Sequence, residues 1–178
     1  AVVHMAGNPS GGASFKETVE ANIIGTHNIY EACKRRDVKR VILASTNHVT
    51  GMYEKKGPIY TTWDMPVRPD SYYGASKAYG EALGRYYVDQ YGLSVICHRI
   101  GSFQPISAVI NRKSDRILST WMSYKDTVQL VWRSIEASGK IDFAIYYGIS
   151  GNTRAYFDIQ NAREEIGYKP EDNSEDHA

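Results

Sequence analysis

The feature that most restricts the fold of this chain is the regular alternation of short apolar runs with longer segments of helical pattern. Val41-Ile42-Leu43-Ala44 is apolar throughout, as expected of a parallel strand that is covered on both faces. Similar runs at residues 1–6, 95–97 and 143–147 are separated by helical segments. This alternation predicts an α/β fold with a parallel sheet and right-handed crossovers, in a single domain over residues 1–178.

Two long helices are expected. The first runs from Ser14 to Arg36, because Ser14 and Glu17 have capping-box spacing and the basic run Lys34–Arg36 suits a helix C-terminus. The second begins at Asp70 or Ser71 and ends at Gly92. Helical spacing predicts that the first helix buries a stripe made of Phe15, Val19, Ile23, Thr26, Tyr30 and Cys33.

The last third of the chain is expected to be less regular. Residues 101–121 read as irregular, and a helix opened by Ser123 and Asp126 follows them. A short helix ends at Gly167, and the polar tail from Pro170 is expected to be loose. The apolar face predicted for the helix after Ser123 consists of Tyr124, Val128, Val131 and Ile135.

The composition is that of an ordinary globular protein, with 42% hydrophobic and 23% charged residues and a net charge of +1. Such a balance disfavours nucleic acid or an anionic membrane as the main partner. Cys33 and Cys97 lie singly in apolar segments, which predicts buried thiols in a reducing compartment, the cytoplasm. His4, His27 and His98 are isolated, and the absence of metal-ligand spacing predicts no metal site.

Tyr73-Gly74-Ala75-Ser76-Lys77 lies near the start of the second helix. Residues four apart share a helix face, so the phenol and the ammonium project to the same side. A phenol titrates near ~10, and a fixed cation nearby would lower its pKa toward neutrality. The spacing therefore indicates a general acid–base pair, although two such residue types at this distance also occur by chance.

Three predicted strands end in small or polar residues: Ala6–Ser10, Ser45–His48 and Arg99–Ser102. The carboxyl ends of parallel strands meet at one edge of the sheet, where open α/β folds bind ligands. The helix of Tyr73 begins at that edge too. This convergence predicts one site formed by the three strand ends and the helix.

These segments resemble the extended short-chain dehydrogenase/reductases, also known as the NAD-dependent epimerase/dehydratase family. The resemblance implies a Rossmann-like, doubly wound sheet and a nicotinamide cofactor. It implies that Tyr73 is the base, that Lys77 lowers the pKa of Tyr73 and holds the nicotinamide ribose, and that the Thr46 hydroxyl bonds the substrate. Asn22 would support a proton-relay water. The cofactor would contact Ala6, Gly7, Lys77 and Ile100.

Within that family, Ser45–Gly51, Arg99–Ser102 and Arg116–Trp121 are similar to segments of the uronate dehydrogenases, which transfer hydride from C1 of a sugar acid to NAD. The resemblance implies an oxidoreductase that acts on a small-molecule uronate. A guanidinium fork matches a carboxylate, which agrees with a clamp at Arg116. The implied substrate contacts are Ser10, Asn47, His48, Ser102 and Arg116.

No glycine-rich dinucleotide motif occurs in the chain, since Gly7–Gly12 has neither that spacing nor a Gly-Lys-Ser/Thr ending. By resemblance, the chain opens at the family's fourth strand, and the first three strands are expected to be missing. We therefore expect the 178-residue chain alone to bind NAD poorly and to turn over negligibly. The choice between NAD and NADP stays open, because the residues that decide it are not in the sequence.

Two alternatives stand beside the dehydrogenase. A nucleotide-sugar epimerase or dehydratase needs a larger C-terminal lobe than the roughly 80 residues after Arg99 provide. A catalytically dead chain that survives as an interaction partner is the other. The family resemblance also implies a homodimer through the helices at residues 14–36 and 70–90.

Overall fold

The computed structural model describes residues 1–55, 57, 59–112 and 114–177. Its central sheet has four strands in the order β1-β2-β3-β6, and each neighbouring pair is parallel. The predicted α/β class with a parallel sheet is therefore confirmed. The strands are β1 (Val2–His4), β2 (Arg40–Thr46), β3 (Ser94–Ile100) and β6 (Phe143–Gly148).

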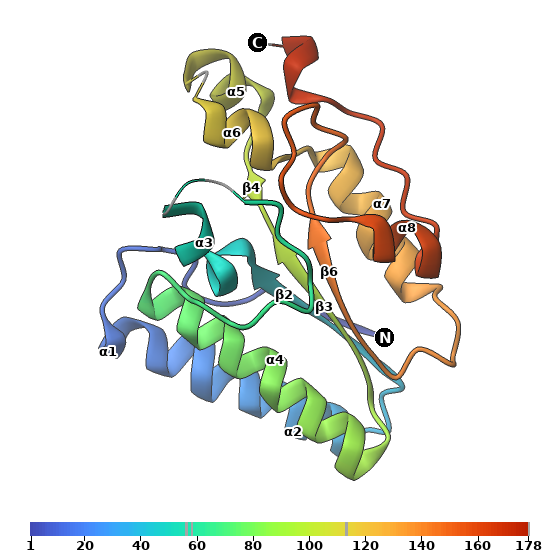
Figure 1. The fold of residues 1–178 in the computed structure, drawn as a ribbon. Helices are drawn as coiled ribbons and strands as arrows, with labels where there is room; N and C mark the ends of the chain where they lie inside the picture. Colours follow the sequence, from blue (N-terminus) through green and yellow to red (C-terminus); the bar gives the residue numbers. More distant parts are fainter. Residues whose placement is uncertain (56, 58, 113, 178) are drawn as a thin grey trace.

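Helices cover both faces of this sheet (Figure 1). On one side lie α1 (Phe15–Thr18), η1 (Val19–Ile24), α2 (Gly25–Arg35) and α4 (Tyr72–Tyr91), and on the other lie α7 (Tyr124–Ile135) and α8 (Gln160–Ile166). Alternate residues of each strand pack against the helices on opposite faces of the sheet, because successive side chains of a strand point to opposite faces. Val41 and Leu43 pack with Tyr30 and Tyr87 toward α2 and α4, whereas Ile42 packs into the other core.

The first long helix begins as predicted but changes its pitch. Ser14 caps α1, and the Glu17 carboxylate accepts a hydrogen bond from the Ser14 backbone at 2.8 Å. The following turn, η1, is a π-helix. This wider turn rotates the helix about its axis, so the predicted stripe is wrong at its start: Phe15 is 62% exposed. The side chains that are buried along this helix are Thr18, Asn22, Thr26, Tyr30 and Cys33.

The second long helix, α4, has the predicted bounds. The Ser71 side chain accepts a hydrogen bond from the backbone N–H of Gly74, and Gly92 ends the helix in the left-handed conformation, with φ of 67°. Gly92 provides this conformation without the steric cost that a side chain would add. The cap at Ser71 fixes where Tyr73 and Lys77 stand relative to the sheet edge.

The face predicted for α7 is wrong at Tyr124 and Val128, whereas Ile135 packs against the core as predicted. Tyr124 and Val128 are exposed, while Leu130 and two polar residues, Asp126 and Ser134, are buried. Asp126 is buried because its carboxylate accepts hydrogen bonds from the Ser150 hydroxyl and from backbone amides of the C-terminal segment. Satisfied hydrogen bonds offset the cost of burying the charge, which hydrophobic periodicity alone does not foresee.

The stretch expected to be irregular contains β4 (Ser102–Phe103), α5 (Ile106–Arg112), α6 (Asp115–Thr120) and β5 (Trp121–Met122). β4 and β5 pair in parallel as a separate small sheet. The tail is ordered rather than loose over residues 170–177. It ends in the short helix η3 (Ser174–His177), and the buried Ser174 hydroxyl donates a hydrogen bond to the Leu118 carbonyl at 2.5 Å.

Cys33 and Cys97 are both buried and free. Over the described residues, no helix combines the length and apolar character that a membrane crossing needs.

Candidate active site

A cavity of about 860 Å³ opens where β1, β2 and β3 end. The strand register explains this position, since Ser45 lies opposite Arg99 and Thr46 opposite Ile100. The strand ends therefore reach one edge together, as the sequence indicated. The cavity brings together most of the predicted site residues, namely Gly7, Thr46, Asn47, His48, Tyr73, Lys77, Ile100, Ser102 and Arg116.

Tyr73 and Lys77 enter this cavity from the first turns of α4 and are 9% and 4% exposed. Burial lowers the pKa of Lys77 to about 8, because the charged ammonium loses solvation. Burial raises the pKa of Tyr73, and a hydrogen bond with Thr46 acts in the opposite direction. The expected lowering of the Tyr73 pKa by the lysine is thus not what the structure gives, because desolvation of the phenol is the larger effect.

Thr46 is the last residue of β2 and caps the short helix η2 (Asn47–Thr50). Its hydroxyl accepts a hydrogen bond from the His48 backbone N–H at 3.3 Å. That contact fixes the hydroxyl beside the Tyr73 phenol. Thr46 is thereby held by the backbone that follows it, and it lines the cavity together with Tyr73.

His48 is held by Asp70, a residue that the sequence analysis did not assign to the site. The Nδ1 atom of His48 lies 2.9 and 3.0 Å from the two carboxylate oxygens of Asp70. The His48 ring also meets the Tyr73 ring edge-on, with centroids 5.8 Å apart. Gly74 makes this packing possible, since a Cβ there would collide with the His48 carbonyl oxygen. Asp70 therefore orients the imidazole of His48. The only sequence signal for this role was the position of Asp70 just before the helix cap Ser71.

Asn22 does not line the cavity but braces the loop that does. It lies in the π-helical turn η1, and its side-chain oxygen accepts a hydrogen bond from the Asn8 backbone N–H at 2.7 Å. Its amide donates to the Asn8 carbonyl and to the Ser76 hydroxyl, at 3.0 and 2.9 Å. Ser76 in turn donates to the Tyr73 carbonyl at 2.7 Å. Asn22 thus ties the end of β1 to the helix that carries Tyr73.

Two predicted contacts, Ser10 and Ala6, are not among the residues that line the cavity. Ser10 is exposed, and its hydroxyl accepts a hydrogen bond from the Gly12 backbone N–H at 3.3 Å. Of the residues that follow β1, Met5 and Gly7 line the cavity instead. Gly7 has a φ of 152°, and a Cβ there would lie 2.8 Å from Asn22 Oδ1 and 3.3 Å from Lys77 Nζ.

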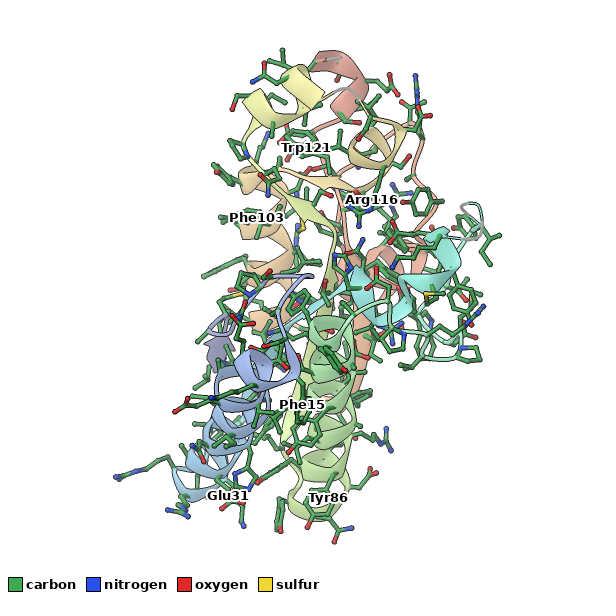
Figure 2. The ribbon with its side chains drawn as sticks, turned by 90° about the vertical axis from the view of Figure 1, so that its left-hand side faces the viewer. Phe15, Glu31, Tyr86, Phe103, Arg116 and Trp121 are labelled. Carbon is green, nitrogen blue, oxygen red and sulfur yellow. The ribbon has the colours of Figure 1, made fainter. Side chains whose placement is uncertain are left out.

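Arg116 and Ser102 line the same cavity and come from α6 and β4. Arg116 Nη1 donates to the Ser102 hydroxyl at 3.3 Å, and Arg116 Nε donates to the Glu54 carboxylate at 2.8 Å. Figure 2 shows Arg116 at the end of the molecule that also holds Trp121, away from Phe15 and Tyr86. Glu54 comes from the short helix α3 (Met52–Lys55), and nothing in the sequence marked it.

The described residues contain no group of three His, Cys, Asp or Glu side chains that could hold a metal ion. The side chains that line the cavity include the hydroxyl of Thr46, the imidazole of His48, the phenol of Tyr73, the ammonium of Lys77 and the guanidinium of Arg116. A polyhydroxylated ligand with an acidic group fits this distribution of donors.

The parallel sheet with helices on both faces is Rossmann-like, and Tyr73 and Lys77 lie at the edge where its strands end. Residues 1–123 match the NAD dependent epimerase/dehydratase family. The chain belongs to that family, which confirms the resemblance drawn from its motifs.

Particular relatives sharpen the assignment. The chain is 40% identical to a uronate dehydrogenase of Pseudomonas putida, covering 98% of this chain and 62% of that protein. It is 38% identical to an L-arabinose 1-dehydrogenase (NAD(P)+) of Haloferax volcanii, covering 97% and 74%. The solved uronate dehydrogenase of Agrobacterium tumefaciens matches with a TM-score of 0.84 and 33% identity, covering 98% and 62%. The chain thus spans about three fifths of the length of the uronate dehydrogenases it matches.

Proposed function

We propose that this chain forms the sugar-binding and proton-transfer part of an NAD-dependent dehydrogenase that oxidises C1 of a uronate. The observation that carries the proposal is the one cavity that Thr46, Tyr73, Lys77 and Arg116 line together. Its similarity to proteins named uronate dehydrogenase supports the substrate class.

In the proposed reaction the C1 hydroxyl of the cyclic sugar acid loses its proton to the Tyr73 phenolate, and C1 loses a hydride as the lactone carbonyl forms. NAD would accept that hydride and leave as NADH. The Thr46 hydroxyl holds the C1 oxygen, and its hydrogen bond with Tyr73 favours the phenolate, while the Lys77 ammonium lines the same cavity one helical turn away. Each of these three side chains is buried, which strengthens its electrostatic effect on the reacting atoms.

The residues beside Gly7 fit the nicotinamide end of such a cofactor. Gly7 lines the cavity and packs closely against two side chains, since a Cβ there would lie 2.8 Å from Asn22 Oδ1 and 3.3 Å from Lys77 Nζ. Ile100 lines the same cavity. Gly7, Lys77 and Ile100 would therefore hold the nicotinamide and its ribose. Because the sequence has no glycine-rich dinucleotide motif, we still expect the 178-residue chain alone to bind NAD weakly.

The decisive measurement is NADH formation with galacturonate and, separately, with UDP-galactose, by this chain and by the complete product of its gene. We expect the complete product to oxidise the uronate and not the nucleotide sugar. Tyr73→Phe should lower kcat by about 100- to 10,000-fold with a smaller change in KM, because it removes the proton acceptor. Activity with UDP-galactose alone, or a Tyr73→Phe variant that keeps its kcat, would contradict the proposal.

We also propose a homodimer through α1, η1, α2 and α4. Large apolar side chains are exposed on these helices, and the rings of Phe15 and Tyr72 lie 5.9 Å apart. Figure 2 shows Phe15 beside α4, with Tyr86 farther along the same pair of helices. Sedimentation equilibrium should give twice the mass of one chain, and a monomer at micromolar concentration would rule the dimer out. The exposed set is Phe15, Ile24, Tyr72, Tyr86 and Tyr91.

A further inference from the structure

Glu54 links two of the cavity residues to a third side chain outside the cavity. Its Oε1 atom accepts a hydrogen bond from Asn47 Nδ2 at 3.1 Å. Its Oε2 atom accepts from Arg116 Nε and from the Tyr156 hydroxyl, each at 2.8 Å. Asn47 and Arg116 line the cavity, whereas Glu54 is not among its lining residues. Glu54 therefore acts on a ligand through Asn47 and Arg116.

The hydrogen bond with Glu54 occupies one edge of the Arg116 guanidinium and leaves its other edges available to a ligand. Glu54 takes the Nε–H, and Ser102 takes one Nη1–H. A guanidinium has five N–H donors, so its Nη end is available to a ligand carboxylate. The Arg116 side chain is 46% exposed and that of Glu54 only 11%. Of the two partners, it is therefore the arginine that a ligand can reach.

The pair carries no net charge when both partners are ionised. Burial and the neighbouring Glu54 carboxylate raise the pKa of Tyr156, which keeps its hydroxyl protonated and donating. A carboxylate ligand that binds the Nη end therefore meets a guanidinium whose charge is already offset by a second carboxylate. At an effective dielectric of about 40, between the value near a protein surface and that of water, the repulsion between carboxylates on opposite edges of one guanidinium corresponds to roughly five- to tenfold in affinity.

We propose that Glu54 is a positioning residue that determines specificity: it sets how strongly the cavity prefers a sugar acid over the neutral sugar of the same shape. This inference rests on the proposed function, because it assumes that Arg116 meets the distal group of the sugar. With Glu54 in place, Arg116 is held for hydrogen bonding while its electrostatic preference for an anion is reduced.

The test compares two substrates, glucuronate and glucose, in the complete protein and in its Glu54→Gln variant. The two sugars differ only in that glucuronate has a carboxylate where glucose has a hydroxymethyl group. Glutamine retains an acceptor for Arg116 and removes the charge. We expect KM for glucuronate to fall about five- to tenfold, and KM for glucose to change less than about twofold. The ratio of the two kcat/KM values should shift toward the acid by the same factor.

Tyr156→Phe is the matched control, because it removes one hydrogen bond to Glu54 and leaves the charge. This variant should keep the wild-type preference between the two sugars. If it shifts the ratio as Glu54→Gln does, loosening of the cluster rather than charge explains the effect, and the inference is wrong. A Glu54→Gln ratio equal to that of the wild type overturns it as well.

A measurement on the unaltered protein covers the case in which a variant does not fold. Because the pair is neutral, KM for glucuronate in the wild type should rise less than about twofold between low and moderate salt. A steep rise would show that Arg116 acts as an uncompensated cation, which contradicts the inference. If the wild type oxidises neither sugar, the proposed function fails and this inference fails with it. Oxidation of glucuronate with an unshifted ratio defeats only the role of Glu54.

Discussion

Two glutamate–arginine pairs in this molecule use the same chemistry in different surroundings. Glu81 and Arg99 lie between α4 and β3, with side chains 5% and 2% exposed, and they form two hydrogen bonds of 3.0 and 2.9 Å. Glu54 and Arg116 form a single one at 2.8 Å, and the arginine is half-exposed. The first pair is enclosed on every side, whereas the second leaves one end of its guanidinium facing the cavity.

The enclosed pair satisfies its remaining polar atoms within the protein. Ser45 donates to Glu81 at 2.6 Å, and Arg99 donates to the Trp63 carbonyl at 3.0 Å. Burial alone would lower the pKa of Arg99, but the contact with Glu81 carries it above its usual range. The comparison shows that solvent exposure decides what each ion pair does. The enclosed pair Glu81–Arg99 holds β2 beside Thr46, whereas the partly exposed pair Glu54–Arg116 presents a hydrogen-bond donor to a ligand.

The largest effect expected is on the enclosed pair. Glu81→Gln leaves a buried guanidinium without its counter-charge, which should lower the free energy of unfolding by about 3–5 kcal/mol. Glu54→Gln is the control, with an expected loss below about 1 kcal/mol because its pair is partly solvated. Urea unfolding followed by circular dichroism measures both. Equal losses in the two variants would erase the distinction between the pairs.

A buried cation without a carboxylate partner among the described residues, Lys77, extends the comparison. Lys77 is 4% exposed, and its pKa of about 8, against 10.5 for a free lysine, corresponds to about 3 kcal/mol of destabilisation at neutral pH. Both the folded and the unfolded states are protonated below pH 8, so the cost is complete there. It declines as the pH rises from about 8 and vanishes above about 10.5, where both states are neutral.

Lys77→Met should therefore raise the free energy of unfolding by about 3 kcal/mol at pH 7, and this gain should shrink through the alkaline range. Urea unfolding at a series of pH values provides the profile. Lys140→Met removes an exposed lysine and should leave the stability unchanged within about 0.5 kcal/mol. A Lys77→Met variant that is less stable than the wild type at pH 7 would show that the ammonium is well solvated or paired in the folded state.

The smallest effect concerns the open end of the second pair. Arg116→Ala should raise KM for a uronate by about 10- to 100-fold, because a charge-assisted hydrogen bond is lost, while the free energy of unfolding changes by less than about 1 kcal/mol. Steady-state kinetics and urea unfolding on the same preparation separate the two quantities. Equal losses for acid and neutral sugars would remove Arg116 from substrate recognition.

Much of the fold was predictable because its signals are local. The apolar runs gave the strands, and the Ser14 and Ser71 caps fixed the starts of the two long helices. Helix spacing also predicted that Tyr73 and Lys77 share a face, and the strand ends predicted where Thr46 lies. These inferences need only neighbours along the chain, which is why the structure agrees with them.

What could not be predicted depends on contacts between distant residues. Glu54 and Asp70 come from a long polar segment without periodicity, and their partners Arg116 and His48 are chosen by the fold. The buried Asp126 looks like a surface residue until the C-terminal segment supplies its donors. Phe15 was assigned to the core because the change of pitch after it leaves no mark in the pattern of apolar residues.

That change of pitch has a consequence for how the molecule tolerates variation. Because η1 is a π-helical turn, the residues before it and after it do not continue one helical face. The segment that carries Phe15 and the segment that carries Tyr30 therefore present different faces to the protein. Substitutions at the outer end can accumulate without disturbing the packed end. Deleting one residue of η1 would restore a uniform spiral, swing the Asn22 amide away from Asn8, and release the loop that borders the cavity.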